Sequence, residues 1–126
     1  MKEFEKWFKK AENDLLSITN NLSAEEIPID VCCFHAQQAA EKYLKAYLVS
    51  RKIHFPKTHD LKALCKLCAG LNPSFSEIDG AALRLSDYAI ATRYPDAFDD
   101  LNIHDAKTAL EDALIIKKFV LKNFFN

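Results

Sequence analysis

The sequence predicts an all-α fold, an up-and-down antiparallel bundle of four to five helices in one domain spanning residues 1–126. The chain has only 2 Gly and 4 Pro, too few for the many tight turns of a sandwich or barrel. Ala, Leu, Lys and Glu are plentiful and favour helix. Apolar residues also recur at helical spacing along most of the chain.

The first two helices follow from this spacing. The first runs from about residue 3 to 22, with one apolar face formed by Phe4, Trp7, Phe8, Ala11, Leu15 and Ile18. The second runs from about 28 to 51. Pro28 suits its first turn, and Pro56 disfavours helix at the residue before it, so a connection follows.

The third helix is expected from about 59 to 69. Thr58 is a plausible N-cap, and Asp60 suits the positive end of the helix dipole. Gly70 and the Asn-Pro pair that follows end the helix.

The last two helices have their own start and stop signals. Ser74 and Glu77 match a capping box and open a helix that Pro95 stops, at about residue 92. Asn102 or Asp99 caps the final helix, which runs to about residue 124. Its buried stripe is Ala106, Ala109, Leu110, Ala113, Ile116, Val120 and Phe124.

Short connections between helices favour antiparallel neighbours. We therefore expect the end of the second helix, the start of the third, the end of the fourth and the start of the fifth at one pole. That pole would collect three polar stretches, "EKYLKAYLVSRK", "KTHDL" and "TRYPD".

The charge balance limits the classes of partner. The 17 basic and 18 acidic residues give a net charge of −1, so any nucleotide or nucleic-acid site must be a local cluster. No apolar stretch is long enough to span a bilayer, and "MKEFEKWFKK" lacks the apolar core of a secretion signal. We expect a cytoplasmic protein with no membrane partner.

The four cysteines are Cys32, Cys33, Cys65 and Cys68. The last two have the spacing of a metal or redox pair, but they fall on an apolar helical stripe, where free cysteine behaves as a small hydrophobe. The first two are adjacent, so they point to different helix faces and make a poor second pair for zinc. We expect reduced thiols packed in the core, with no metal and no cofactor.

On the second helix, four polar residues share one face at spacings of three and four: Gln38, Glu41, Lys42 and Lys45. Glu41 and Lys45 can pair at i,i+4. A solvated face with one weak ion pair is the alternative to a binding face. The neighbouring amides of Gln37 and Gln38, in the middle of an otherwise apolar-backed helix, favour specific hydrogen bonding.

"KTHDL" places Lys57, Thr58, His59 and Asp60 at a helix start, where unpaired backbone N–H groups favour an anion. His59 could donate or accept a proton near neutrality. The alternative is a capping arrangement without a ligand.

"TRYPD" places Arg93, Tyr94 and Asp96 at the break after the fourth helix. Arg93 offers a planar fork for phosphate or carboxylate, and Tyr94 offers a ring for stacking. The alternative is that Arg93 satisfies the last helix carbonyls and pairs with a nearby acid.

The stretches "FHAQQAAEKYLKAYLVSRK", "KTHDLKAL" and "YAIATRYPD", in this order, resemble the HEPN domain family, named for higher eukaryotes and prokaryotes nucleotide-binding. The resemblance covers nearly the whole chain, beginning at "WFKKAENDLLSI". It implies a compact helical bundle that commonly forms a homodimer. It also implies one of two roles, the partner of a small nucleotidyltransferase in a toxin–antitoxin-like module, or a metal-independent RNase with an Arg-x4–6-His motif at the dimer cleft.

The chain departs from the RNase pattern. Counted from Arg93, the positions where histidine is expected hold Phe98, Asp99 and Asp100, and His104 lies too far along. The RNase assignment is therefore not carried over by motif, and the chain is expected to be a binding protein rather than an enzyme. His59 and Arg93 are the weak candidates for a nonstandard catalytic pair.

The sequence leads to one main hypothesis and two alternatives. The main one is a HEPN protein that binds a nucleotide or its phosphate-bearing substrate as the partner of a nucleotidyltransferase. The alternatives are an RNase toxin acting on RNA without the standard motif, and a module for protein interaction alone. The expected ligand-binding residues are Gln38, Glu41, Lys42, Lys45, Lys57, Thr58, His59, Asp60, Arg93, Tyr94 and Asp96.

Overall fold

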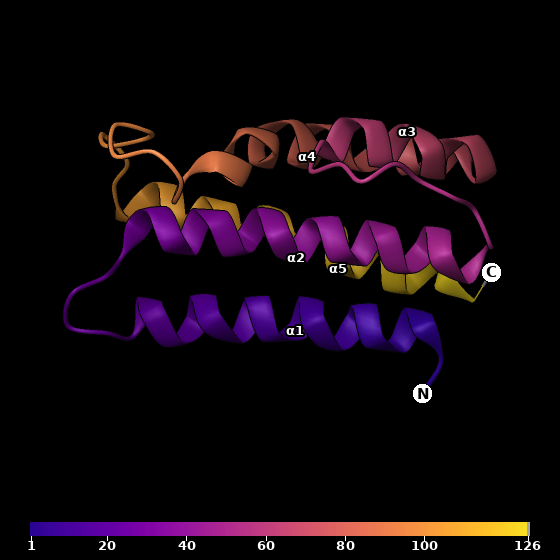
Figure 1. Cartoon of the computed structure of the whole chain (residues 1–126), viewed down its shortest axis with the longest axis horizontal. Helices are drawn as coiled ribbons and strands as arrows, with labels where there is room; N and C mark the ends of the chain where they lie inside the picture. Colours follow the sequence, from indigo (N-terminus) through magenta and orange to yellow (C-terminus); the bar gives the residue numbers. More distant parts are fainter. Residues whose placement is uncertain (126) are drawn as a thin grey trace.

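The structure, a computed structural model, describes residues 1–125, and that range contains helices and no strand (Figure 1). The five α-helices are α1 (Glu3–Leu22), α2 (Ile29–Ser50), α3 (Leu61–Leu71), α4 (Asp79–Ser86) and α5 (Ile103–Phe124), and two short 3₁₀ helices are η1 (Pro73–Ile78) and η2 (Asp87–Ile90). The predicted all-α bundle is confirmed. None of the helices in the described range is both long and apolar enough to cross a membrane.

Helix α2 lies at the centre of the bundle. It packs against α1, α3, α4 and α5, and most of its residues are buried. Helix α1 runs antiparallel to it, and Phe8 on α1 meets Tyr43 on α2 with ring centroids 5.7 Å apart. Helix α5 runs parallel to it, and the Arg51 guanidinium after α2 donates to the Phe124 carbonyl at 2.5 Å.

The core is apolar and rich in aromatic rings at the end of the bundle that holds both termini. Rings there meet at centroid distances near 5 Å, the range of favourable aromatic pairs. The members of this aromatic cluster are Phe4, Phe8, Tyr47, Phe75, Phe119 and Phe124.

All four cysteines are buried in this core, which confirms the prediction of packed thiols. Burial raises the pKa of Cys65 from an ordinary 9.0 to about 12. Burial likewise raises the pKa of Cys33 to about 12, with the Asp105 carboxylate adding to the effect. The thiols therefore stay protonated and behave as small hydrophobic side chains.

The start of α3 differs from the prediction. The helix begins at Leu61, and the Asp60 side chain caps it by accepting from the Lys62 N–H at 3.0 Å. The Thr58 hydroxyl instead accepts from the Asp60 N–H at 3.0 Å. The expected Thr58 cap is wrong by two residues because two cap-forming side chains lie close together and the second one is used.

The predicted fourth helix is divided into η1, α4 and η2. Pro73 opens η1, and Asn72 rather than Ser74 supplies the cap, accepting from the Ser74 N–H at 3.0 Å. Phe75 and Ile78, three residues apart, both enter the core, which suits a turn of three residues. At α5 the Asn102 cap is confirmed, with a capping box completed by Asp105.

The predicted meeting of three polar stretches at one pole is wrong. Residues 51–60 turn back along α2, so α3 begins beside the middle of α2 and runs parallel to it (Figure 1). The Gln37 amide donates to the His59 carbonyl at 2.9 Å, and Cys68 lies 3.9 Å from the Leu44 carbonyl oxygen farther along. The connection is long enough to reverse direction, so the rule for short connections does not apply to it.

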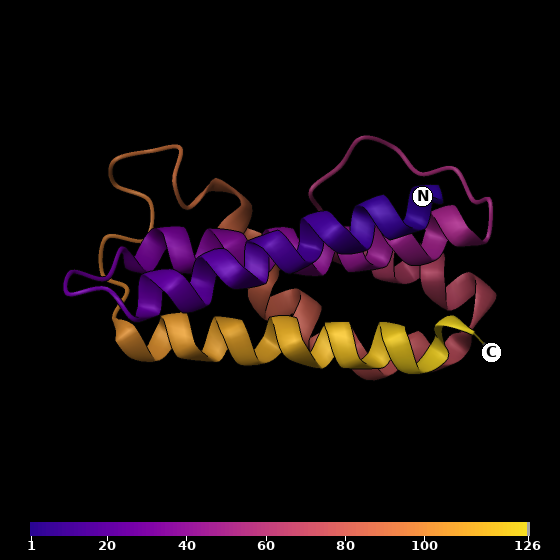
Figure 2. The same cartoon turned by 90° about the horizontal axis from the view of Figure 1, so that it is seen from below.

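Two connections rise on the same side of α2, the side opposite α5 (Figure 2). They are residues 51–60 and residues 91–102, and we call this side the loop face. Five residues of α2 that are only partly buried recur at helical spacing: Val31, Phe34, His35, Gln38 and Lys42.

Candidate functional site

A buried carboxylate, Glu41, organises the first polar cluster of the loop face. Its side chain is 4% exposed, and its Oε1 lies 2.7 Å from Nδ1 of His59. Its Oε2 accepts from Nζ of Lys45 at 3.0 Å. The Gln37 amide donates to the same carboxylate at 3.3 Å and to the His59 carbonyl at 2.9 Å. The imidazole is thus fixed both through its ring and through its backbone.

The burial of Glu41 and Lys45 excludes the interpretation of this face as solvated. A solvated face would leave both side chains in water, whereas residue exposures are 3% and 7%. The Lys45 ammonium also lies 5.7 Å and 5.6 Å from the ring centroids of Trp7 and Phe55, in reach of cation–π attraction. The predicted i,i+4 pair is confirmed, as an interior contact.

His59 remains accessible although its partner is buried. Its side chain is 52% exposed. With Nδ1 directed at a carboxylate, Nε2 is left as the outward nitrogen. The ring is therefore oriented from behind and open in front, as in sites where a carboxylate positions a working histidine.

A second cluster of the same chemistry lies between α1 and α2. Asp14 is 7% exposed, and its two oxygens lie 2.8 Å from Nδ1 of His35 and 2.6 Å from Nζ of Lys42. The Gln38 amide reaches the first cluster by donating to Oε1 of Gln37 at 2.7 Å. Two carboxylates, two lysines and two histidines therefore follow one side of α2.

The remaining residues of "KTHDL" have structural positions. Asp60 caps α3 and Thr58 binds the Asp60 backbone, as described above. Lys57 is exposed, and its side chain makes no hydrogen bond or ion pair to any of residues 1–125. Thr58 and Asp60 thus fix the turn that presents His59.

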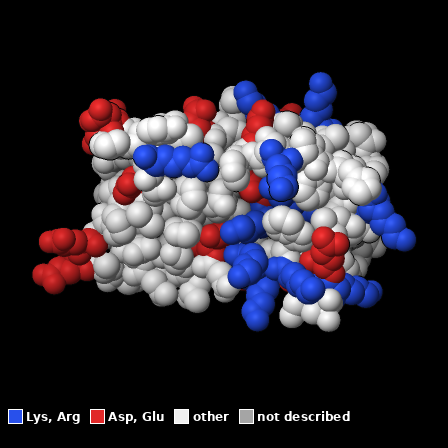
Figure 3. Space-filling view, in the orientation of Figure 1, with Lys and Arg blue, Asp and Glu red and all other residues white. Residues whose placement is uncertain are grey.

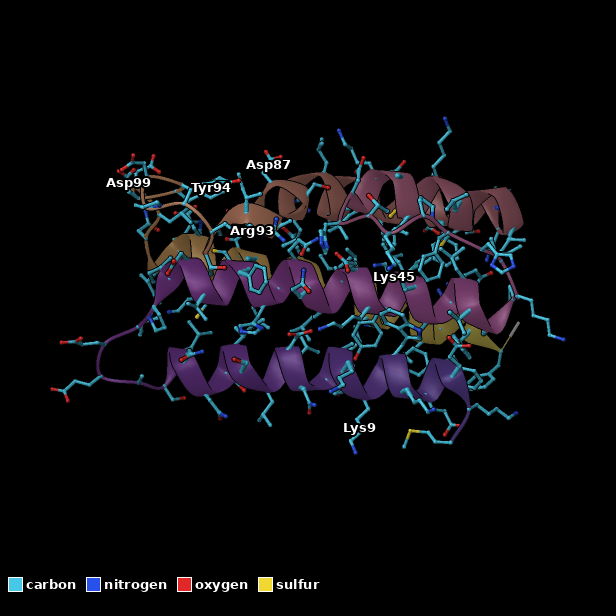
Figure 4. All side chains as sticks on the ribbon, in the orientation of Figure 1. Lys9, Lys45, Asp87, Arg93, Tyr94 and Asp99 are labelled. Carbon is cyan, nitrogen blue, oxygen red and sulfur yellow. The ribbon has the colours of Figure 1, made fainter. Side chains whose placement is uncertain are left out.

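Arg93 lies apart from the Glu41 cluster (Figure 4). The view places Arg93 over the first part of α2 and Lys45 farther along the same helix. Arg93 and Tyr94 line a hollow of about 420 Å³ beside the start of α2, together with Asp30 and Asp99. Asp96 is exposed near them but does not line this hollow.

Arg93 has a free side chain within the described part of the chain. Its backbone N–H donates to the Ile90 carbonyl, while its guanidinium has no hydrogen-bond or ion-pair partner there. The interpretation in which Arg93 satisfies the last helix carbonyls through its side chain is therefore wrong. Tyr94 beside it is 60% exposed.

Phe98 anchors this connection. Its φ of 57° is in the left-handed region that non-glycine residues seldom adopt. Its ring packs edge-on against Tyr88 at a centroid distance of 5.3 Å. Phe98 occupies one of the positions where the RNase pattern described above expects histidine, and here its ring packs against the protein.

Sequence reasoning missed Asp14 and His35. The signal for Asp14 was present, since it falls at helical spacing between Ala11 and Ile18 on the apolar face of α1. An acid on a buried stripe requires a partner. The same signal marks Asp112, which Arg84 holds with two hydrogen bonds at 3.0 Å and 2.8 Å.

No cluster in the described range offers the ligands of a metal site, since no three His, Cys, Asp or Glu side chains converge there. The chemistry of the loop face is that of protonatable rings, ammonium groups and amides. Such groups recognise anions and hydrogen-bonding ligands.

The sequence pattern of the HEPN domain matches residues 4–123. The chain belongs to the HEPN domain family. Two solved structures are similar over almost their whole length. TT1696 from Thermus thermophilus is 29% identical, with a TM-score of 0.80 over 97% of this chain and 98% of that one.

The second similar structure is ST0689, described as an archaeal HEPN homologue. It is 25% identical, with a TM-score of 0.77 over 98% of this chain and 99% of that one. No curated protein matches the chain significantly. The HEPN assignment therefore rests on the family pattern and on two structures.

Proposed function

We propose that this HEPN protein binds the phosphate of a nucleotide on its loop face and acts as the partner of a small nucleotidyltransferase. The observation that carries the proposal is the His59 imidazole, held from behind by buried Glu41 and open to solvent in front. Glu41 occupies one edge of the ring, and the other edge is accessible to a ligand.

The charges of the two clusters favour an anionic ligand. The carboxylates of Asp14 and Glu41 balance the ammonium groups of Lys42 and Lys45. A proton on either histidine then leaves an uncompensated positive charge on the loop face. A phosphate supplies the counter-charge and accepts charge-assisted hydrogen bonds from the imidazolium.

Arg93 and Tyr94, at the separate hollow beside the start of α2, form a second proposed subsite of the loop face. An unpaired guanidinium offers a planar fork for a phosphate, and the exposed tyrosine ring beside it offers a stacking surface for a base. Asp30 and Asp99 line the same hollow and can accept hydrogen bonds from hydroxyl or amino groups of a nucleoside.

An RNase activity is not proposed. The chain lacks the Arg-x4–6-His motif, and Phe98 is packed on Tyr88 where such a histidine would stand. The role beside a nucleotidyltransferase, in a toxin–antitoxin-like module, is supported by family membership alone. Its test is co-purification of the chain with a nucleotidyltransferase encoded beside it.

Calorimetry with ATP, GTP and a short single-stranded RNA tests the binding proposal. We expect one of these ligands to bind, and His59→Ala and Arg93→Ala each to weaken it roughly tenfold, the size of one charge-assisted hydrogen bond. His54→Ala and Lys66→Ala are the controls, because both side chains are exposed and neither lines the proposed site. Absence of binding, or equal affinity in all four variants, would refute the proposal.

A further inference from the structure

The four histidines of the chain differ in two properties that decide how an imidazole reacts, the exposure of the ring and a carboxylate on one of its nitrogens. His54 and His104 are exposed, and neither side chain makes a hydrogen bond or an ion pair to residues 1–125. His35 has a carboxylate, with its Nδ1 2.8 Å from Asp14, but its side chain is only 27% exposed. Of these four rings, all within the described residues, His59 alone is both half exposed and held by a carboxylate.

The carboxylate behind His59 is itself fixed. Glu41 accepts from the Lys45 ammonium at 3.0 Å and from the Gln37 amide at 3.3 Å, and its side chain is 4% exposed. An ionised carboxylate only accepts hydrogen bonds, so the neutral ring carries its proton on Nδ1 and its lone pair on Nε2. The outward nitrogen is therefore the nucleophilic one, and the contacts behind the ring hold it in one direction.

The half of the bundle that holds both termini is the more basic one. It carries 14 Lys and Arg against 7 Asp and Glu, in residues 1–12, 40–79 and 113–125. The other half, residues 13–39 and 80–112, carries 3 Lys and Arg against 11 Asp and Glu. Lys and Arg accordingly gather over the first half (Figure 3). His59 lies within residues 40–79, so the charge of this half favours the approach of an anionic reagent.

The charges closest to His59 in the chain have the same effect. Lys57 is exposed, and its ammonium has no partner among residues 1–125. The Asp60 carboxylate is occupied as the cap of α3, where it accepts from the Lys62 N–H at 3.0 Å and the Ala63 N–H at 3.4 Å. A phosphate at Nε2 therefore has a free ammonium group in the same connection, while the adjacent acid is bound to the helix backbone.

We propose that His59 is a nucleophile that takes up a phosphoryl group on Nε2 from a small activated phosphate of the phosphoramidate or acyl phosphate class. The Nε2 lone pair forms the bond to phosphorus. The bond from phosphorus to the leaving group breaks, and its electron pair departs with the leaving group, which is ammonia in the case of phosphoramidate. Nδ1 keeps its proton, so the phosphorylated ring is a cation. Glu41 faces that cation and acts as a positioning residue that also stabilises its charge.

This inference rests on the proposed function in one respect, the placing of a phosphate at His59. It goes further in predicting a covalent bond, which requires neither a nucleoside nor the hollow beside Arg93. The two are distinguishable by experiment. Labelling of His59 without nucleotide affinity would refute the proposed function alone, and nucleotide affinity without labelling would refute the covalent step alone.

Incubation of the folded full chain with phosphoramidate, followed over time by peptide mass spectrometry, measures the phosphorylation of all four histidines in one sample. We expect His59 to be labelled roughly tenfold faster than His54 and His104, the lower end of what a carboxylate contributes behind a metal-binding histidine. His35 should be labelled more slowly than His59 because most of its ring is covered. Phosphorus NMR should place the group on Nε2. Equal rates at His59, His54 and His104, or a product on Nδ1 of His59, would overturn the proposal.

A double variant tests the role of Glu41 without leaving a buried charge. Glu41→Gln alone would leave the Lys45 ammonium uncompensated, so it is combined with Lys45→Met, which replaces the ion pair by uncharged side chains of similar size. Circular dichroism checks the fold. The faster labelling of His59 should disappear, while the rates at His54 and His104 stay as in the wild type. Faster labelling that persists in the folded double variant would overturn the role of Glu41, and if that variant does not fold, the four rates in the wild type decide.

Discussion

Helix α2 buries ionisable groups on two of its sides, and the groups on the two sides have different polar partners. Toward the loop face, Glu41 is 3% exposed and its carboxylate meets an ammonium, an imidazole and an amide. Toward the opposite core, Cys33 is fully buried and its thiol has the Tyr88 hydroxyl and the Asp105 carboxylate as polar neighbours. Burial alone therefore does not decide the charge state of a side chain.

The difference shows that the polar partners of a buried side chain decide its charge state. Desolvation penalises any buried charge, and only opposite charge or hydrogen bonds offset the penalty. Burial raises the pKa of Cys33, no cation in the described part of the chain offsets it, and the thiol remains neutral. Glu41 has Lys45 at 3.0 Å, so a carboxylate can be kept inside the protein. The neutral thiol of Cys33 packs in the core, whereas the paired carboxylate of Glu41 holds His59.

The largest effect is expected from removing the buried carboxylate of Glu41. Glu41→Ala should lower the free energy of unfolding by roughly 3–5 kcal/mol, because Lys45 would be left as an uncompensated buried charge. Urea titration of variant and wild type measures the loss. Asp14→Ala is the matched comparison and should lose less, since the Lys42 side chain is 22% exposed and can turn to water. A loss for Glu41→Ala no greater than that for Asp14→Ala would show that burial of the lysine partner does not set the size of the loss.

The effect of the buried Cys33 thiol on stability should appear at alkaline pH. The pKa of Cys33 is 9.0 in its ordinary state and about 12 in the folded chain, so above pH 9 the unfolded state releases the proton first. The free energy of unfolding should then fall by up to about 1.4 kcal/mol per pH unit for this thiol, between pH 9 and 12.

Urea titrations at several pH values measure this slope. Cys33→Ala should flatten it, and the contribution of Cys65, whose pKa is raised in the same direction by burial, should remain. A slope that is identical in the variant would mean that the Cys33 thiol ionises as readily inside the protein as outside.

The smallest effect is expected from removing the accessible ring of His59. His59→Ala should change the free energy of unfolding by about 1 kcal/mol or less, because the side chain is half exposed and Glu41 keeps Lys45 and Gln37. Thermal unfolding followed by circular dichroism measures the change. A loss as large as that of Glu41→Ala would make His59 a structural residue and remove the support for a ligand there.

Local pattern was enough to predict several features of this molecule. Helical spacing placed the apolar stripes and the buried cysteines, and the Asn102 cap followed from its residue type and position. The i,i+4 spacing predicted the Glu41–Lys45 pair. Each of these depends on residues within a few positions of one another, and such distances are fixed by the helix itself.

Cap choice was less secure even though it is local. Thr58 and Asp60 can both cap a helix, and so can Asn72 and Ser74. In each pair the side chain that lies directly before the first turn of the packed helix is used. The core decides where that turn begins, because Leu61 and Phe75 must both be buried.

The sequence by itself determined the family, the all-helical class and the polar residues from which a site could be built. Only the tertiary structure decided which of them meet. It turned residues 51–60 back along α2, joined His59 to Glu41 and left Arg93 at a separate hollow. It also arranged a nearly neutral composition into a basic and an acidic half. The physical reason is that the direction of a connection and the position of a charge depend on how whole helices pack, which no local spacing records.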